Sequence, residues 1–513
     1  MEILDCTLRD GGYYTDWNFP KKIVDSYLKT LSNLPISTVE LGYLSNKKDN
    51  NGLFYHLSKS ILLNARSSLR KDQKIYVMIN FKEIKNSKSL ESLIYDKHKI
   101  IDGLRFAIAP KDIAKFLRIA NPIIKKYKKL EFNVNIMYLS KWIKDENFFK
   151  KILKDLSTKV YTLSFVDSYG ALTPEEIKVF LDKIKKYKNN NLKLGCHFHN
   201  NCGLALANSI IAANSGCSVV DSTFKGMGRG AGNTETELLI ANDKTKNKKI
   251  SGFELNNLLE IFEKMKINMG WGSSFTYAFA AKNGFPQGEM MDLMQKRRLD
   301  PDTAAKVIST KLTNINQIKF SNLKKIFVKK NIINNFPIII GGGSSLSDYG
   351  EYFFKHINKK SPIILSGSTA LFNFLNLEIK IKNPIILILI GSEIKKINLT
   401  KNKNILEKID LSGVIVEKDF ISSKSNLIKN AQVAVSTSVA VNPVLLAGMA
   451  LLKMKINKMQ LAFFDGNPEE IRGRVVMRET QQSIDFLKSK GLKLFTLTKS
   501  FLNLTQLNPW IND

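Results

Sequence analysis

The sequence predicts an eight-stranded β/α barrel, followed by a helical segment and an open α/β domain. Two observations predict the barrel: β-rich runs alternate with helical stretches from residue 1 to about 240, and there are eight such runs. This alternation implies parallel strands, and eight units of that total length fit a closed barrel better than a doubly wound open sheet. The predicted strands are Ile3–Leu8, Thr38–Leu44, Lys74–Asn80, Gly103–Ala109, Glu131–Met137, Val160–Ser168, Leu192–His199 and Val219–Phe224.

Amphipathic stretches between these strands predict the helices of the barrel. Two clear examples are Ala114–Tyr127 and Pro174–Tyr187. The second carries helix-start signals, because Thr173 is a good N-cap, proline suits the first helical position and two glutamates follow in the first turn.

The remainder of the chain divides into a helical segment and a second α/β domain. Residues 250–310 have mainly helical patterns, including Leu255–Lys266 and Asp302–Lys311, and a Lys/Asn-rich stretch follows. We therefore predict a barrel catalytic domain over 1–245, a helical extension and linker over 246–334, and a Rossmann-like α/β domain over 335–513. The strands predicted in this last domain are Pro337–Gly342, Pro362–Ser366, Ile385–Gly391, Gly413–Glu417, Gln432–Ser436, Gln460–Asp465 and Leu492–Leu497.

The strongly basic composition raises the question of a nucleic-acid partner. The 513 residues carry a formal net charge of +32, yet the lysines are scattered along the whole chain. A nucleic-acid binder gathers Lys and Arg on one stripe, interleaved with aromatic residues. We therefore expect solvated basic faces and no nucleic-acid partner, while attraction to anionic lipid or to acidic, phosphorylated substrates stays open.

Cysteine usage and hydropathy indicate the compartment. The four cysteines are Cys6, Cys196, Cys202 and Cys217, and none forms a CxxC pair, which favours a reducing compartment. The longest apolar run, Pro384–Ile390, has the length of a strand and not of a membrane span. The first residues lack the pattern of an export signal. We expect a cytoplasmic protein without a membrane span; a homo-oligomer stays open.

The seventh predicted strand ends in the sequence His197-Phe198-His199. Side chains alternate along a strand, so the two histidines share one face and Cys196 takes the other. In a barrel, the carboxyl ends of the strands carry the active site. A lone histidine is usually a core residue, but two imidazoles on one face at this place favour a metal site, and the same alternation argues against Cys196 as a ligand.

Arg9 and Asp10 follow the first predicted strand and precede two glycines. Taken alone, they fit a surface ion pair beside a turn as well as a functional pair. One carboxylate and two imidazoles would leave open metal positions, which suits Mn²⁺, Mg²⁺, Co²⁺ or Zn²⁺. The same ligand set also describes non-haem iron oxygenases, which are therefore a rival class.

Three further features lie at the predicted rim of the barrel. Glu40 and Asp167 end the second and sixth strands, and a glycine-rich loop, residues 225–233, follows the eighth. Such a loop fits either an anion site or a tight structural turn.

Five ordered motifs over about 240 residues resemble the HMG-CoA-lyase-like, or pyruvate-carboxyltransferase-type, barrel family, and its aldolase branch in particular. They are LDCTLRDGGY (Leu4–Tyr13), VELGY (Val39–Tyr43), DSYGALTPEE (Asp167–Glu176), GCHFHNNCGLALANS (Gly195–Ser209) and GRGAGNTETE (Gly228–Glu237). The resemblance implies that Asp10, His197 and His199 hold a divalent metal. It also implies that Arg9 neutralises an enolate oxygen and that Asn233 lies in a loop near the metal.

One position departs from the family pattern. The 4-hydroxy-2-oxovalerate aldolases place a catalytic histidine four residues after the arginine, where this chain has Tyr13. Tyr13, Tyr14 or a water molecule on the metal are the candidate bases. Our predicted site comprises Arg9, Tyr13 and Glu40 as catalytic residues, with Asp167 and Asn233 joining Arg9 in binding substrate.

These residues fit a metal-dependent aldolase or lyase acting on pyruvate or another 2-oxo acid together with an aldehyde, with Mn²⁺ as the first expected metal. A Claisen-type acyl-CoA transferase and an iron oxygenase are rival enzymes. A non-catalytic sugar-binding or scaffold protein is the rival from another class.

The second domain carries one motif of interest, in which residues 341–345 join a predicted strand to a helix. Such a glycine-rich turn can cradle phosphate, but it lacks both the GxGxxG spacing and the Walker lysine, so an ordinary turn is favoured. The region weakly resembles the C-terminal domains of longer aldolase-like proteins linked to bacterial surface-glycan synthesis. That resemblance implies a connection to sugars or nucleotide-sugars, and a role in polysaccharide biosynthesis.

Overall fold

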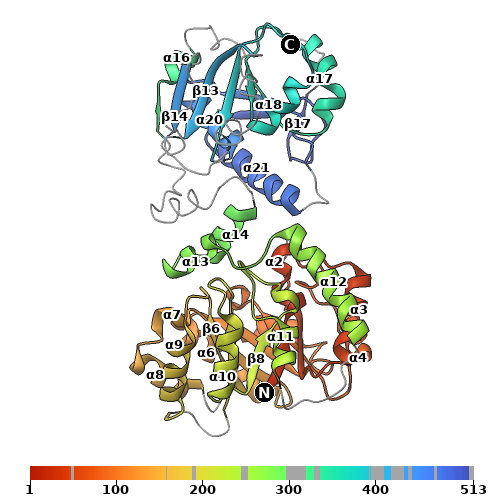
Figure 1. The fold of residues 1–513 in the computed structure, drawn as a ribbon, viewed down its shortest axis with the longest axis vertical. Coiled ribbons are helices and arrows are strands. Elements are labelled where there is room, and N and C mark those ends of the chain that lie inside the picture. Colours follow the sequence, from red (N-terminus) through yellow and green to blue (C-terminus); the bar gives the residue numbers. More distant parts are fainter. Residues whose placement is uncertain are drawn as a thin grey trace. The chain divides into compact units, whose positions relative to one another are not determined.

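The computed structural model separates the chain into two compact units, Met1–Met291 and Asp292–Asp513, which we call the barrel unit and the second unit (Figure 1). The predicted three-part division stays a prediction, and the predicted helix Asp302–Lys311 lies outside the described residues. The structure describes residues 1–47, 51–156, 159–187, 192–243, 252–295, 319–327, 336–391, 393, 409–417, 432–436, 442–466 and 471–507.

The barrel unit confirms the predicted fold. Its eight strands close in sequence order, and each neighbouring pair is parallel, including the closing pair in which Glu2 lies opposite Val219. The strands are β1 (Glu2–Asp5), β2 (Thr38–Leu44), β3 (Lys74–Ile79), β4 (Gly103–Ile108), β5 (Glu131–Ile136), β6 (Thr162–Asp167), β7 (Lys193–Phe198) and β8 (Val219–Ser222).

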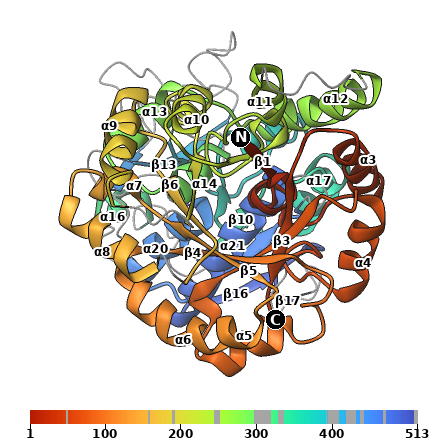
Figure 2. The same ribbon diagram turned by 90° about the horizontal axis from the view of Figure 1, so that it is seen from below.

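Helices surround these strands in a ring, which Figure 2 shows from below. Thr173 forms a capping box with Glu176 at the start of α9, as its sequence signals indicate. The helices of this unit are α1 (Thr7–Asp10), α2 (Gly12–Thr15), α3 (Lys21–Ser32), α4 (Lys59–Ser68), α5 (Ser87–Ile94), α6 (Ile113–Lys126), α7 (Leu139–Trp142), α8 (Glu146–Leu156), α9 (Pro174–Ile184), α10 (Ala205–Asn214), α11 (Thr236–Asn242), α12 (Gly252–Met269), α13 (Phe275–Lys282) and α14 (Gln287–Gln295).

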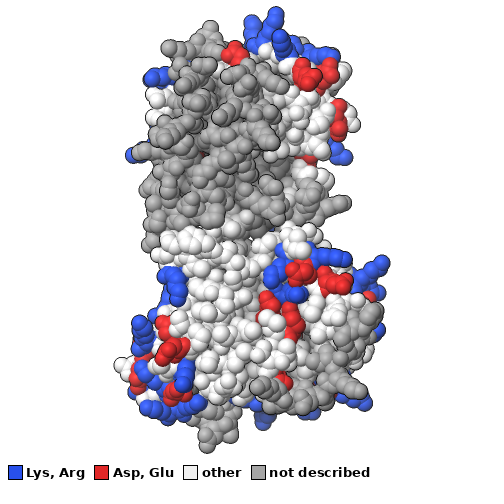
Figure 3. Space-filling view, viewed as in Figure 1, with Lys and Arg blue, Asp and Glu red and all other residues white. Residues whose placement is uncertain are grey.

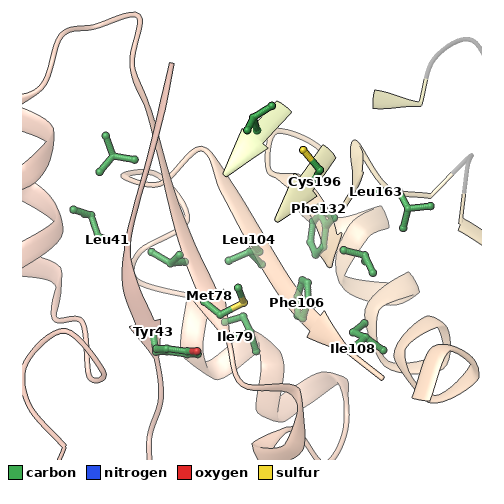
Figure 4. Close-up of a cluster of buried hydrophobic side chains, with 14 of the residues drawn as sticks. Leu41, Tyr43, Met78, Ile79, Leu104, Phe106, Ile108, Phe132, Leu163 and Cys196 are labelled. Atoms are coloured by element: carbon green, nitrogen blue, oxygen red, sulfur yellow. The ribbon is translucent and has the colours of Figure 1, made fainter. Parts of the chain in front are cut away.

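Alternation along the strands separates the apolar core from the polar interior of the barrel. On β4, Leu104, Phe106 and Ile108 share one face and belong to the buried hydrophobic cluster drawn in Figure 4. Burial of such a side chain stabilises the fold by roughly 1.5–3 kcal/mol. Arg105 lies between them in sequence, so its side chain takes the opposite face of the strand, inside the barrel.

The first strand is shorter than predicted. The pattern predicted Ile3–Leu8, but β1 ends at Asp5 and the chain turns into α1. The Asp5 carboxylate accepts hydrogen bonds from the Thr7 backbone N–H at 2.9 Å, from the Tyr27 hydroxyl at 2.6 Å and from the Thr236 hydroxyl at 2.7 Å. This network fixes the turn, because a buried carboxylate must satisfy its acceptors. Arg9 and Asp10 therefore lie on a helical turn at the rim.

The second unit is an open α/β sheet, as predicted, with strand order β17-β16-β15-β10-β11-β12-β13-β14-β9. All neighbours are parallel except β14 and β9. All seven predicted strands are present. The strands are β9 (Phe320–Ser321), β10 (Ile338–Ile340), β11 (Ile363–Leu365), β12 (Ile385–Leu389), β13 (Leu411–Glu417), β14 (Gln432–Ser436), β15 (Lys458–Ala462), β16 (Lys493–Thr496) and β17 (Thr505–Gln506).

Helices cover both faces of this sheet. Ile338 and Ile340 of β10 point into one apolar core with Leu346 and Phe353 of the helix that follows, whereas Ile339 points into the other core. The helices of the unit are α16 (Leu323–Phe327), α17 (Ser345–His356), α18 (Ser368–Leu375), α20 (Pro443–Lys453) and α21 (Ile471–Ser489).

The described surface shows how the charges are distributed. On the face of the barrel unit in Figure 3, basic side chains are interspersed with acidic ones. Surface ion pairs of this unit include Lys150–Glu146 and Lys225–Glu263. The absence of a nucleic-acid partner stays a prediction. Within the described ranges, no helix combines the length and apolarity that crossing a membrane requires.

Candidate metal centre

Asp10, His197 and His199 meet at the carboxyl ends of β1 and β7. Their ligand atoms all lie within 4.8 Å of one another, and all three side chains are buried. Nε2 of His197 is 3.6 Å from Oδ2 of Asp10, and the two imidazole centroids are 5.0 Å apart. Residues from opposite ends of the barrel sequence converge here because β1 and β7 both flank β8.

The donor set fits a divalent metal. Nδ1 of His199 is buried without a hydrogen-bond partner, as is the side-chain oxygen of Asn233. Burial lowers the pKa of His199 to about 3, so the imidazole is neutral and its lone pair is available. Burial opposes ionisation of Asp10, but Arg9 and the two imidazoles outweigh it and lower the pKa of this carboxyl to about 2. Two imidazoles and one carboxylate suit Mn²⁺, Co²⁺ or Zn²⁺.

A second group of three side chains, Cys6, His197 and Asp221, is less suited to a metal. These also lie within ligand distance of one another. Nδ1 of His197 is already engaged with Asp221, and burial raises the pKa of the Cys6 thiol well above its ordinary value. A protonated thiol is a poor ligand, so the set of Asp10 and two histidines is the better candidate.

Arg9 connects the candidate metal ligands to the second strand. Its Nη1 pairs with Asp10, and its Nε donates to Oε2 of Glu40 at 2.9 Å. Arg9 is buried, and Trp17 donates its indole N–H to the Arg9 carbonyl at 2.8 Å, which fixes the backbone. Glu40 therefore holds the guanidinium. It does so from within β2 and not from its end, contrary to the prediction, because β2 continues to Leu44.

Arg105 and Asp221 extend this arrangement, and neither was predicted from the sequence. Arg105 donates to Glu40 at 3.1 Å and to Asp221 at 2.7 Å, and it is 1% exposed. Oδ2 of Asp221 in turn lies 3.0 Å from Nδ1 of His197. A charged residue within an otherwise apolar predicted strand was the available signal. We call the series Asp10, Arg9, Glu40, Arg105, Asp221 and His197 the buried ion-pair chain.

The buried ion-pair chain orients the imidazole of His197. Burial opposes ionisation of Asp221, but Arg105 outweighs it and lowers the pKa of the Asp221 carboxyl. An ionised carboxylate only accepts, so Nδ1 of His197 carries the hydrogen and Nε2 presents its lone pair toward Asp10. Such a partner for the far nitrogen is the usual way in which a ligating histidine is held.

Asn233 lies against the candidate centre, whereas among the hydrogen bonds of the described residues none joins Asp167 to it. The Asn233 amide donates to Asp10, and its backbone forms a bridge with His199. Asp167 accepts from the Leu172 backbone N–H at 2.9 Å. Burial raises the pKa of Asp167 to about 6, because desolvation outweighs the hydrogen bonds from its own loop. Asp167 thus holds the loop after β6, and its role in substrate binding stays a prediction.

The glycine-rich loop 225–233 forms a tight turn that delivers Asn233. Gly232 has a φ of +93°, and a Cβ there would collide with the Gly226 carbonyl. The Asn233 backbone N–H donates to that carbonyl at 3.0 Å. These contacts favour the structural interpretation of the loop over an anion site.

The two candidate tyrosine bases differ in their surroundings. Tyr14 is buried and donates its hydroxyl to the Gly230 carbonyl at 2.6 Å, and burial raises its pKa well above the ordinary value. Tyr13 is partly exposed, lies 5.0 Å from the Trp17 ring and carries the Arg229 guanidinium over its own ring at 5.2 Å. Because Tyr14 is committed to the glycine-rich loop, Tyr13 is the better placed of the two for proton transfer.

The chain is similar to several known proteins. The family described as HMGL-like matches residues 106–264. A crystal structure of the N-terminal domain of a candidate aldolase from Bacteroides vulgatus is 36% identical, covers 57% of this chain and 97% of its own, and has a TM-score of 0.53. A 4-hydroxy-2-oxovalerate aldolase from Carboxydothermus hydrogenoformans is 28% identical over 47% of this chain and 70% of its own length.

A third relative, the 4-hydroxy-2-oxovalerate aldolase from Pelotomaculum thermopropionicum, is 45% identical over a shorter region that covers 15% of this chain and 22% of the relative. The solved structure shares the barrel fold, and the two sequence relatives are named as aldolases. The chain therefore belongs to the HMGL-like family and is an enzyme of the aldolase and lyase kind.

Proposed function

We propose that the barrel unit is a divalent-metal-dependent aldolase or lyase that acts through the enolate of pyruvate or another 2-oxo acid. The observation that carries the proposal is the convergence of Asp10, His197 and His199 beside the buried guanidinium of Arg9. The relatives named 4-hydroxy-2-oxovalerate aldolase support a 2-oxo acid as the substrate class.

In this proposal, Asp10, His197 and His199 would hold the metal. When bound, a divalent ion supplies Lewis acidity toward the oxygens of a 2-oxo acid. Arg9 then acts as the fixed cation for the oxygen on which charge develops. Its Nε and Nη1 are engaged with Glu40 and Asp10, and among the hydrogen bonds of the described residues none uses Nη2. That nitrogen remains for a substrate oxygen.

Proton transfer is assigned to Tyr13. Its place at the rim, partly exposed and next to the Tyr43 hydroxyl, allows a substrate hydroxyl to reach it. Replacement of Tyr13 by Phe removes the hydroxyl and keeps the ring packed against Trp17. We expect this variant to lose both cleavage of the carbon–carbon bond and the reverse condensation with an aldehyde, with metal binding unchanged.

Several finer points remain proposals. Manganese is the first metal to test, followed by Mg²⁺, Co²⁺ and Zn²⁺, because a mixed nitrogen and oxygen donor set accepts all of them. A sugar-derived aldehyde, a role in surface-glycan biosynthesis and a cytoplasmic location stay predictions from the sequence.

The test of the proposed function is exchange of the pyruvate methyl protons in deuterated water, followed by NMR. The metal-loaded chain should catalyse the exchange, and both chelation and His197→Ala should abolish it. Absence of exchange with every metal, in a chain that binds metal stoichiometrically, would exclude pyruvate. Release of free CoA from acetyl-CoA or uptake of oxygen would then identify the rival acyltransferase or oxygenase.

A further inference from the structure

The second unit contains a cavity at the point where the order of its strands reverses. From β10 the sheet continues through β11 to β14 on one side and through β15 to β17 on the other. The helix after β10 and the helix after β15 cover opposite faces of the sheet, so a crevice opens between the carboxyl ends of these two strands. In open parallel sheets, ligands bind at this reversal point.

The glycine-rich turn after β10 does not offer the phosphate cradle that such sheets often use. The Asp465 carboxylate, which follows β15, accepts from the Ser345 backbone N–H at 2.8 Å and from its hydroxyl at 2.5 Å. A Cβ on Gly343 would collide with this carboxylate. The protein's own anion therefore occupies the N-terminus of α17, and a ligand anion must be bound elsewhere.

Aromatic side chains line the cavity from two separate segments. The cavity has a volume of about 1030 Å³, which suits a small organic ligand. Tyr349, Tyr352 and Phe353 come from one face of α17, and Phe501 comes from the segment after β16. Tyr349 is 67% exposed and Phe501 64%, so these two rings retain large apolar faces that a ligand would cover.

A lysine side chain also lines this cavity. Lys499 lines it and is exposed, and the ion pairs of the described residues do not include it. Its neighbours are anchored: Thr498 accepts from the Phe463 backbone N–H at 2.7 Å, and Ser500 donates to the Phe464 carbonyl at 2.5 Å. Because these bonds tie the segment to the end of β15, little ordering is needed to present the lysine to a ligand.

We propose that this cavity binds a small molecule that carries a planar ring and an anionic group, with the ring stacked on Tyr349 and Phe501 and the anion paired with Lys499. Stacking on aromatic side chains supplies affinity for any planar ring, and an ammonium group supplies preference for the charged form. A nucleoside monophosphate has this chemistry and is the simplest probe. The cavity belongs to the second unit and the candidate metal centre to the barrel unit, so either proposal can fail without the other.

The test is isothermal titration calorimetry of the full chain with AMP and UMP, and with adenosine and uridine as matched ligands without the phosphate. We expect the nucleotides to bind more tightly than the nucleosides. Phe501→Ala should weaken both kinds of ligand by roughly 5- to 150-fold. Lys499→Ala should weaken only the nucleotides, by roughly 1.5- to 5-fold, so that the preference for phosphate disappears.

Two exposed residues outside the cavity provide controls. Tyr95→Ala removes an aromatic ring that is 69% exposed on the barrel unit, and Lys380→Ala removes an exposed cation of the second unit. Both should leave all four affinities unchanged. The proposal is overturned if neither nucleotide binds at millimolar concentration, if Phe501→Ala binds as tightly as the parent, or if nucleosides and nucleotides bind equally well to the parent chain.

Discussion

In the barrel unit, the buried carboxylates of Glu40 and Asp221 pair with an arginine side chain, whereas in the second unit the carboxylates of Asp465 and Glu393 accept hydrogen bonds at the starts of helices. Glu40 and Asp221 both pair with Arg105. Asp221 also contacts Nδ1 of His197, so that the Nε2 atom faces Asp10 at the candidate metal centre. In the second unit, Asp465 caps α17 and Glu393 accepts from the Ser368 backbone N–H at 3.1 Å.

This difference separates a functional use of acidic residues from a structural one. A carboxylate that pairs with a side-chain cation can orient a neighbouring ligand, because the pair fixes its direction and its charge. A carboxylate that caps a helix has its oxygens committed to the backbone. In the proposed function, the barrel unit thus keeps a site for a metal cation, whereas in the second unit the Asp465 carboxylate occupies the N-terminus of α17.

The largest effect is expected for Arg105→Met, which interrupts the buried ion-pair chain. Glu40 and Asp221 would lose a shared partner while buried, and the free energy of unfolding should fall by about 3–5 kcal/mol. Denaturant unfolding of the barrel unit measures this change. Lys126→Met, which removes one exposed pair with Glu91, should leave the free energy of unfolding nearly unchanged, because water screens the pair. Equal losses of unfolding free energy in the two variants would mean that the buried pairs of Arg105 contribute no more than an exposed pair.

Arg9→Lys tests the guanidinium that faces the developing charge. A lysine keeps the positive charge but cannot bond Asp10, Glu40 and a substrate oxygen in one plane. We expect kcat to fall about 100- to 1000-fold, with one metal still bound per chain. If metal binding falls in parallel with kcat, Arg9 acts through Asp10 and not on the substrate.

Asp10 and Asp167 both lie at the rim of the barrel, yet their pKa values shift in opposite directions. For Asp167 the folded pKa is raised to about 6, above the unfolded value of about 3.9. Its protonated form therefore stabilises the fold at low pH, and this stability is lost as the pH rises through about 6. The loss amounts to about 2–3 kcal/mol.

The side chain of Asp167→Asn stays neutral throughout this range. The variant should therefore be more stable than the parent at pH 7, and its free energy of unfolding should not fall between about pH 4 and pH 6. Urea unfolding at several pH values measures it. Asp182→Asn, which changes an exposed carboxylate on α9, is the matched control. An unchanged pH profile in Asp167→Asn would show that the buried carboxyl does not titrate in this window.

The smallest effect is expected for Ser345→Ala in the second unit. It removes the hydroxyl bond to Asp465 and keeps the bond from the backbone N–H. The unit should lose about 1 kcal/mol of stability, as measured by thermal unfolding. A loss of several kcal/mol would mean that Asp465 depends on this hydroxyl more than on the helix N-terminus.

Pattern and periodicity located the barrel strands and seven strands of the second sheet, because each has an apolar face that the sequence displays. The two-residue strands β9 and β17 were missed, because they are too short to show a pattern. The end of β1 was misjudged, since the turn at Asp5 depends on Tyr27 and Thr236, which lie far away in sequence. Asp10, His197 and His199 were accessible through their residue types and strand positions. Arg105 and Asp221 were missed, because only the closed barrel reveals that one inward-facing guanidinium reaches both Glu40 and Asp221.

The most direct test of the central claim is titration of the chelated, full-length chain with Mn²⁺, followed by electron paramagnetic resonance of the free ion. We predict one ion bound per chain, lost in Asp10→Asn and in His197→Ala and retained in His98→Ala, which changes a histidine remote from the centre. Equal binding by the parent chain and the Asp10 and His197 variants would contradict a metal centre at these three residues.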